Sequence, residues 1–269
     1  MTQSSMMSQQ AISLYTQEVL RDGFCVVSSL FSRATLARWR QAFHPLLDAY
    51  ITEGGSELNR GSARYYVTLP FVEPFADPSI FEHDALLAIL EGLVGEDFVM
   101  CQLATDTPLR GSDYQPTHRD APPLFPETGS ETPPFQLAVN FPLVDVTAAN
   151  GPIEIARGTH MLPKAEALAR IEAGTIKLEP ILMQAGDVMI RDVRGLHRGT
   201  PNRTDIPRPM VVIGYSRRWL QRPEVDIEIP EETYRRLSPR AQLMLRYNPR
   251  VDAVSPHRPK QESYDTFAY

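Results

Sequence analysis

Two short motifs in the chain contain side chains that can bind a metal ion together. His118 and Asp120 are separated by one residue, Arg119. In an extended segment, residues two apart point to the same face, so the imidazole and the carboxylate project together while Arg119 points away. A second imidazole, His197, follows 79 positions later in the chain, after a strand-like run. Two imidazoles and one carboxylate on one face of a metal leave three positions open, an arrangement that non-haem Fe(II) oxygenases use.

These motifs need support from the rest of the chain. A His-X-Asp tripeptide occurs by chance in many proteins, and a lone histidine near a strand end is usually a surface or hydrogen-bonded core residue. The two cysteines, Cys25 and Cys101, lie far apart in apolar runs, which is typical of buried free thiols. The chain therefore lacks the soft, cysteine-rich ligand set that indicates zinc or an iron–sulfur cluster.

The first part of the chain reads as mainly helical. Residues Ser8 to Arg21 predict a helix that Gly23 ends, and Cys25-Val26-Val27 predicts a short strand. Ser32 caps a second amphipathic helix that Pro45 is expected to kink or divide, and Gly54-Gly55 end this unit. A third helix is expected from Asp84 to Leu93.

From Phe98 onward the pattern changes to short strands. Apolar and β-branched runs, such as Phe135 to Phe141 and Met210 to Tyr215, alternate with turn residues. This spacing favours a sandwich or jelly roll over βαβ units. The segment Pro122–Pro134 contains five prolines and predicts a long ordered loop, a candidate lid over the active site. A last helix is expected at about Glu231 to Arg246.

Length and composition are typical of one globular domain over residues 1–269. We expect a helical N-terminal part at about 8–95, a jelly-roll core at about 96–220 and a C-terminal helix and tail at 221–269. The net charge is −6, with both signs interspersed, which argues against nucleic acid or an anionic membrane as a partner. No apolar stretch reaches the ~18 residues of a membrane span, and the N-terminus has no pattern of an export signal. A cytoplasmic monomer or homodimer is the expectation.

Five motifs in order resemble the phytanoyl-CoA dioxygenase family of Fe(II)/2-oxoglutarate-dependent oxygenases, from about Tyr15 to Arg246. They are Val19 to Val27, His118-Arg119-Asp120, Asn150-Gly151-Pro152-Ile153 with Arg157-Gly158-Thr159-His160, Gly186-Asp187-Val188, and His197 to Asn202 with Arg208. The resemblance implies a mainly β fold with flanking helices around a double-stranded β-helix, the cupin-like jelly roll. It also implies that His118, Asp120 and His197 bind Fe(II).

The resemblance assigns further residues to 2-oxoglutarate, the cosubstrate that is used with dioxygen. Arg208 lies where this family has the arginine that binds the far carboxylate, and a planar guanidinium can meet a carboxylate with two hydrogen bonds. Gln102 matches a polar position beside the cosubstrate, and Asn140 and Thr200 are candidates for the same lining. Many relatives have a serine where this chain has Gly199. One hydrogen bond to the cosubstrate is therefore in doubt, although Thr200 could supply it.

The implied reaction is oxidation, in the first place hydroxylation, of an unactivated C–H bond of a small-molecule metabolite, with decarboxylation of 2-oxoglutarate to succinate. Asp120 stands where halogenating relatives have a small residue, which argues against halogenation and leaves desaturation, ring closure or epimerisation open. Candidate substrate residues are Tyr66, Arg119 and Phe125, although Arg119 could instead form a salt bridge. Loops at Arg60–Thr68, Asp113–Pro116 and Pro122–Pro134, together with the C-terminal helix, are expected to set specificity.

Two other functions stay open at this point. One is a jelly-roll metalloenzyme, such as an isomerase or hydrolase, that does not use 2-oxoglutarate. The other is a catalytically silent binding protein on the same scaffold. Arg208 discriminates between the first alternative and the oxygenase, because only the oxygenase needs it.

Overall fold

Antiparallel strands form the centre of the computed structural model, which describes residues 7–53, 60–220 and 227–254. The large sheet has six strands in the order β1-β7-β4-β9-β3-β2. Their bounds are β1 Phe24–Val27, β7 Val188–Asp192, β4 Gln136–Pro142, β9 Met210–Ser216, β3 Val99–Pro108 and β2 Arg64–Thr68. Every pair of neighbours in this sheet is antiparallel, as expected for a jelly roll.

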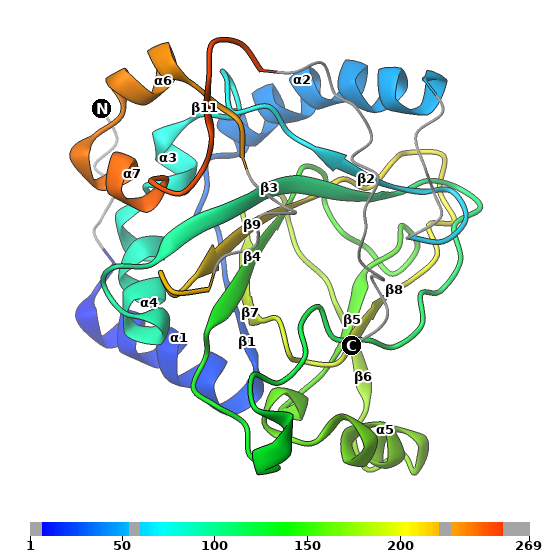
Figure 1. Cartoon of the computed structure of the whole chain (residues 1–269). Coiled ribbons are helices and arrows are strands. Elements are labelled where there is room, and N and C mark those ends of the chain that lie inside the picture. The colour runs from blue at the N-terminus through cyan, green and yellow to red at the C-terminus, as the bar shows by residue number, and fades with distance from the viewer. Residues whose placement is uncertain (1–6, 54–59, 221–226, 255–269) are drawn as a thin grey trace.

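A second, smaller sheet has the order β6-β5-β8 and lies beside the large one (Figure 1). Its strands are β5 Ile153–Ala156, β6 Leu178–Ile181 and β8 His197–Gly199, and helix α5 (Lys164–Glu172) connects β5 to β6. A third pair, β10 (Ile229–Pro230) with β11 (Arg250–Val251), is parallel. The space between the large sheet and the β6-β5-β8 sheet is where the metal-binding motifs meet.

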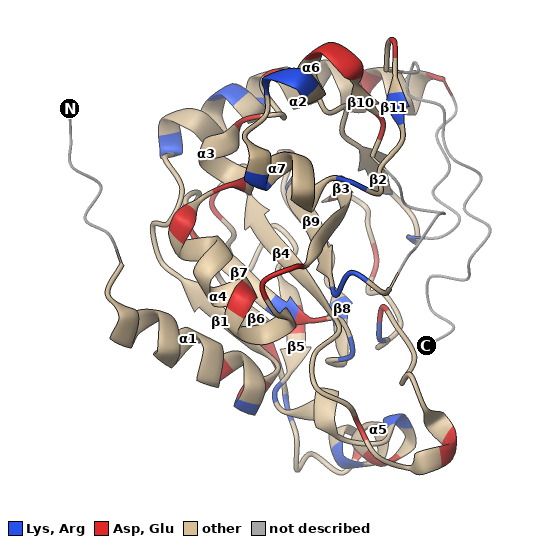
Figure 2. Ribbon diagram, turned by 60° about the vertical axis from the view of Figure 1, so that its left-hand side comes forward, with Lys and Arg blue, Asp and Glu red and all other residues tan. Residues whose placement is uncertain are grey.

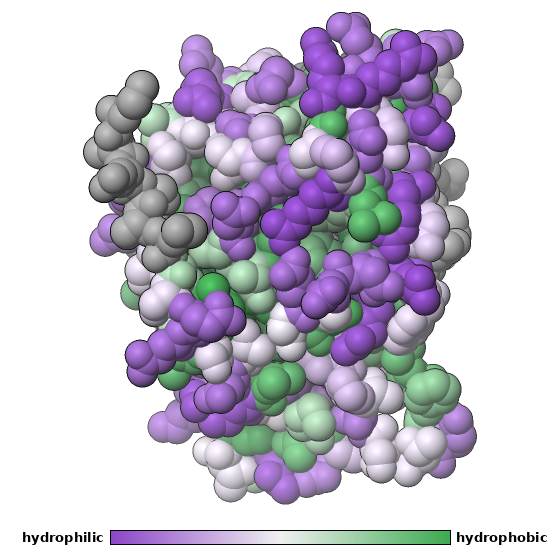
Figure 3. All heavy atoms as spheres, turned by 90° about the vertical axis from the view of Figure 1, so that its left-hand side faces the viewer, coloured by the Kyte–Doolittle hydropathy of each residue, from purple (hydrophilic) through white to green (hydrophobic). Residues whose placement is uncertain are grey.

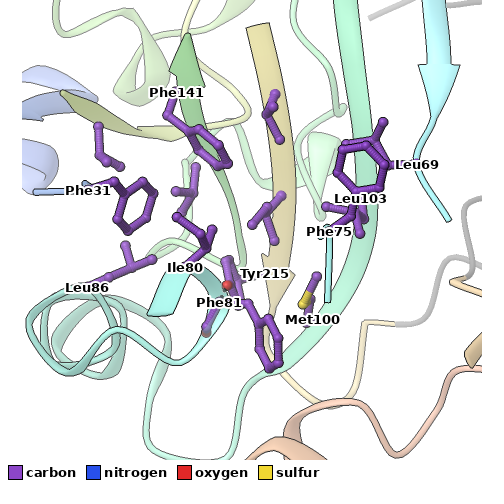
Figure 4. Packing of buried hydrophobic residues seen from close by; sticks show 14 of the residues in the cluster. Phe31, Leu69, Phe75, Ile80, Phe81, Leu86, Met100, Leu103, Phe141 and Tyr215 are labelled. Atoms are coloured by element: carbon purple, nitrogen blue, oxygen red, sulfur yellow. Dashed lines mark hydrogen bonds between the residues drawn. The ribbon is translucent and has the colours of Figure 1, made fainter. Parts of the chain in front are cut away.

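Helices cover the outer face of the large sheet. They are α1 Gln9–Asp22, α2 Arg33–Thr52, α3 Pro78–Phe81 and α4 Asp84–Val94. Figure 4 shows the core between these helices and the sheet, where Phe31 and Phe141 point toward one another. Their ring centroids lie 5.0 Å apart, and Trp39 of α2 contacts Phe141 at 5.5 Å. Phe141 thus joins the sheet to α2.

The alternation of side chains along the strands separates the core from the interior of the barrel. On the helix side, β4 presents Leu137, Val139 and Phe141, and all three belong to the main hydrophobic cluster. On the opposite side, Gln136, Ala138 and Asn140 line a cavity between the two sheets. The same division holds for β9, where Val211 and Ile213 pack in the core while Met210 and Val212 line the cavity. Because both faces are buried, the strands read as nearly continuous apolar runs.

Most predicted elements are present, with differences at particular residues. Helix α1 begins after the Ser8 cap and ends at Gly23 in a left-handed conformation, as predicted. Of the two outcomes expected at Pro45, a kink or a division, the division is wrong, since α2 runs through this residue without a break. Burial of Phe43 and Leu47 on either side of it outweighs the loss of one amide donor.

The C-terminal helix was predicted too long. It is two short helices, α6 (Glu231–Arg236) and α7 (Pro239–Met244), because Ser238 caps a new helix that has Pro239 at its first position. The expected loop Arg60–Thr68 contains strand β2, and helix α5 was not predicted. The strand predicted at Cys25-Val26-Val27 is present as β1, whereas β2 was not predicted, and both join the large sheet from the part of the chain that was read as mainly helical. Gly54-Gly55 and the tail from residue 255 lie outside the described residues.

Charged residues of both signs are interspersed along the ribbon (Figure 2). On the face shown in Figure 3, hydrophilic side chains predominate and hydrophobic ones are scattered among them. This distribution is usual for a globular protein in water. Within the described part of the chain, no helix combines the length and the apolar character needed to cross a membrane.

Phe141 and Phe125 provide a matched test of the core. Phe141 is fully buried, whereas Phe125 in the proline-rich loop is 52% exposed. We expect Phe141→Ala to lower the free energy of unfolding by about 3–5 kcal/mol, because it leaves a cavity between β4 and α2. Phe125→Ala should change it by less than about 0.5 kcal/mol. Urea denaturation followed by circular dichroism measures both, and equal losses for the two variants would contradict this packing.

Candidate metal centre and cosubstrate cavity

His118, Asp120 and His197 come together at one point of the structure. An isolated antiparallel bridge joins His118 to His197, with the two N–H···O bonds both 3.0 Å long. The amide of Asp120 donates to the carbonyl of Val193, just beyond β7, at 2.9 Å. The three side chains offer ligand atoms that all lie within 4.8 Å of one another. Backbone pairing between distant segments therefore places the two imidazoles and the carboxylate around a common centre.

Both imidazoles are held in the same way. The Nδ1 atom of His118 lies 2.7 Å from the carbonyl oxygen of Pro116, and Nδ1 of His197 lies 3.0 Å from that of Gly195. A carbonyl only accepts, so each Nδ1 carries the proton and each Nε2 offers a lone pair. The two Nε2 atoms lie 3.7 Å and 3.5 Å from Oδ1 of Asp120. This tautomer is the one that a metal ion between the three side chains requires.

The charge states of the three groups also suit a cation. Burial lowers the pKa of His197 to about 3, with Arg191 adding to the effect, and burial also lowers the pKa of His118. Burial by itself would raise the pKa of Asp120, but Arg191 and the two imidazoles hold it well below its usual range. At neutral pH the site therefore has two neutral imidazoles and one carboxylate, ready to bind a metal without releasing protons.

Arg191 of β7 is a residue of this site that the sequence analysis did not identify. Its Nη2 donates to Oδ2 of Asp120 at 2.6 Å, and its Nε donates to Oδ1 of Asn140 at 3.1 Å. The arginine thus occupies the outer oxygen of Asp120 and leaves Oδ1, which faces the two Nε2 atoms, free for a metal ion, which favours a carboxylate ligand that uses one oxygen. A charged residue directly after the buried run Val188-Met189-Ile190 was the available signal.

Arg208 is fully buried in the wall of the same cavity. Burial lowers its pKa to about 10, so the guanidinium stays charged at neutral pH. Its Nη2 donates to the carbonyl of Gly151 at 2.5 Å, while its Nε has no hydrogen-bond partner among the described residues. A buried guanidinium with an unsatisfied N–H in a cavity wall is suited to a ligand oxygen.

The departure from serine at position 199 has a structural explanation. A Cβ atom at Gly199 would lie 2.5–2.7 Å from the guanidinium of Arg64, which fills this space. Arg64 is fully buried, donates to the carboxylate of Asp106 at 2.8 Å and donates to the carbonyl of Thr200 at 2.7 Å. Burial alone would raise the pKa of Asp106, but Arg64 and Arg208 hold it below its usual value. The sequence analysis missed both Arg64 and Asp106, since neither belongs to a motif.

Three other residues from the sequence analysis lie at the cavity. Gln102, Tyr66 and Asn140 all line it, and the amide of Gln102 donates to the hydroxyl of Tyr66. The guanidinium of Arg60 stacks over the ring of Tyr66, with its central carbon 4.2 Å from the ring centroid. Tyr66, Gln102 and Asn140 therefore reach the cavity wall from β2, β3 and β4, respectively.

Three residues of the sequence analysis are not brought to the cavity. The hydroxyl of Thr200 donates to the carbonyl of Pro152 at 2.7 Å and is buried there, so Thr200 does not replace the missing serine. Phe125 is half exposed at the surface and does not line the cavity. Arg119 is fully buried on the far side of its segment and pairs with Glu131. Of the two roles expected for it, Arg119 therefore forms a salt bridge and does not face the cavity.

Solved structures with the same fold include enzymes that catalyse different reactions. The 2-oxoglutarate-dependent epimerase SnoN from nogalamycin biosynthesis is similar with a TM-score of 0.61 and 20% identity, over 78% of this chain and 84% of that one. The carbocyclase SnoK from the same biosynthesis has a TM-score of 0.58 at 16% identity, over 79% and 85%. HygX from Streptomyces hygroscopicus, solved with nickel and 2-oxoglutarate, has a TM-score of 0.57 at 14% identity, over 83% and 91%.

A family model supports the same relationship through the sequence. The model described as phytanoyl-CoA dioxygenase (PhyH) matches residues 19–210, which include all three candidate metal ligands and Arg208. The match spans more than half of the chain and agrees with the jelly-roll architecture of the structure. The chain belongs to the phytanoyl-CoA dioxygenase family.

Proposed function

We propose that the protein is an Fe(II)/2-oxoglutarate-dependent oxygenase that oxidises, in the first place hydroxylates, a C–H bond of a small-molecule metabolite. The observation that carries the proposal is the convergence of His118, Asp120 and His197 in one cavity with the buried Arg208. Two imidazoles and one carboxylate fit Fe(II) and leave coordination positions open. The buried guanidinium of Arg208 in the wall of the same cavity suits a carboxylate of the cosubstrate.

Bound iron and 2-oxoglutarate would supply the activation of dioxygen, with succinate and carbon dioxide as coproducts. The residues of the chain supply the geometry for this reaction. His118 and His197 present Nε2 because their Nδ1 protons are held by backbone carbonyls. Arg191 keeps the outer oxygen of Asp120 occupied, and Arg208 anchors an anion in the cavity wall. Apolar side chains such as Val193 and Val212 line the same cavity beside these polar groups.

The substrate side of the cavity has fewer constraints. Tyr66 and Gln115 present hydrogen-bonding groups on the cavity wall, and Ile153 and Met210 present apolar ones. Such a mixed lining suits a polar organic metabolite rather than a simple hydrocarbon. Since SnoN and SnoK perform epimerisation and ring closure on this fold, product analysis must decide between hydroxylation and these outcomes.

Arg208 tests the role of the cosubstrate. We expect Arg208→Gln to raise the KM for 2-oxoglutarate by about 100-fold, because two charge-assisted hydrogen bonds to the carboxylate are lost. Arg208→Lys should recover only part of this loss, since an ammonium cannot form the paired contact. Substrate-dependent succinate formation measures it, with the exposed Arg110→Gln as the matched control. Normal 2-oxoglutarate affinity in Arg208→Gln, with the protein folded, would instead favour a metalloenzyme that does not use this cosubstrate.

The lowered histidine pKa values predict how metal binding depends on pH. With the pKa of His197 at about 3 and that of His118 also lowered, protons do not compete with the metal near neutrality. The affinity for Ni(II) should therefore change less than about 2-fold between about pH 6.5 and about pH 8. With two histidines of ordinary pKa near 6.5, the affinity would be about 4-fold lower at about pH 6.5 than at about pH 8, because protons would compete with the metal. Competition titrations measure this, and His197→Ala should abolish tight binding at every pH.

Because Asp120 supplies a carboxylate at the metal centre, we expect a product that contains no chlorine. This carboxylate occupies the coordination position that a halide would need, and Arg191 fixes it there. Turnover of an accepted substrate in chloride buffer should give only oxygenated, desaturated, cyclised or epimerised products by mass spectrometry. A chlorinated product from the unmodified protein would show that Asp120 is not a metal ligand during turnover.

A further inference from the structure

A second cluster of charged side chains lies behind the metal centre, and these side chains have little contact with solvent. It consists of Arg119, Glu131, Asp192 and Arg194, whose side chains are each at most 6% exposed. Two guanidinium groups and two carboxylates balance in charge. None of the four lines the cavity, so the proposed reaction does not use them directly. Burying charged groups costs free energy, and a buried ion pair often stabilises a protein no more than apolar residues of the same size would. Stability alone therefore does not explain this cluster.

Glu131 binds two arginines at once. Its Oε1 accepts from Nη1 of Arg119 at 3.2 Å, and its Oε2 accepts from Nη1 of Arg194 at 3.0 Å. Arg194 is further fixed by Asp192 at 2.7 Å and by the carbonyl of Thr132 at 2.8 Å. The carboxylate of Glu131 therefore ties the proline-rich loop at 122–134 to two separate segments of the barrel.

Both of these segments carry metal ligands. Arg119 stands between His118 and Asp120, and its guanidinium points away from them. Arg194 precedes Gly195, whose carbonyl holds Nδ1 of His197 at 3.0 Å. Thr159 joins the two segments as well, because its carbonyl accepts from Arg119 at 2.7 Å and its hydroxyl accepts from the amide of Leu196 at 2.9 Å. Through Arg119 and Arg194, Glu131 is therefore connected to both segments that carry the three ligands.

We propose that Glu131 is a positioning residue for the metal centre, and that the loop at 122–134 is a clamp rather than a lid. The inference rests on the proposed metal binding of His118, Asp120 and His197. The clamp holds the segment of His118 and Asp120 and the turn before His197 at a fixed separation. A ligand set held this way loses little freedom when the metal binds, so the affinity is higher than the three ligands alone would give.

The sharpest test replaces Glu131 by an isosteric neutral group. In Glu131→Gln, one amide arm cannot accept from an arginine, so the two guanidinium groups are no longer joined. We expect the affinity for Ni(II) to fall about 10–100-fold. The visible absorption of the Co(II)-loaded protein, which reports coordination geometry, should change. Glu127→Gln is the matched control, because Glu127 lies in the same loop and is exposed; it should bind Ni(II) like the unmodified protein.

A second variant separates positioning from general stability. Glu131→Gln should also lower the melting temperature, because one buried guanidinium loses its carboxylate partner. Glu131→Leu with Arg119→Met removes one charge of each sign, leaves the pair Asp192–Arg194 in place, and should restore the melting temperature. If Glu131 positions the ligands, Ni(II) affinity stays low in this double variant although the protein is as stable as before. Recovery of both properties together would overturn the inference, as would unchanged affinity and an unchanged Co(II) spectrum in Glu131→Gln. Failure of the unmodified protein to bind Ni(II) would instead contradict the proposed function.

Discussion

The backbone bridge between His118 and His197 is the constraint on which the rest of the site depends. These residues are far apart in the chain, and only the pairing of their segments brings the imidazoles together, with ring centroids 4.4 Å apart. Each amide donates to the carbonyl of the other residue, so the segment that carries His118 and Asp120 extends the small sheet beyond β8. Once this bridge forms, alternation along the extended segment directs Asp120 to the same side as His118 and Arg119 to the opposite side.

The large sheet separates two environments with a single layer of strands. Residues such as Val139 and Ile213 face the helices and form the core, while their neighbours Ala138 and Val212 face the cavity. A shift of the register by one residue would exchange these faces and place polar groups such as Asn140 in the core. The aromatic contacts of Phe141 and the other core residues therefore also determine which side chains reach the metal centre.

Arginines have different tasks on the two sides of the metal-binding segment. Toward the cavity, Arg191 holds the carboxylate of Asp120, Arg64 fills the space beside Gly199, and Arg208 lies buried in the wall with no partner for its Nε among the described residues. Behind the segment, Arg119 and Arg194 share Glu131. Every one of these guanidinium groups is buried and hydrogen-bonded in part to a carboxylate or a carbonyl, which explains how so many cations are accommodated in a small interior.

The sequence by itself determined the ligand types, the alternation that pairs His118 with Asp120, the helix ends at Ser8 and Gly23, and the family. Each of these features depends on residue types and on their spacing along the chain, and both can be read directly from the sequence. Arg191, Arg64, Asp106 and Glu131 could be assigned only from the tertiary structure. Their roles arise from contacts across strands, such as that of Arg191 with Asp120, 71 residues apart. No local pattern specifies such contacts, because strand order and register depend on packing of the whole chain.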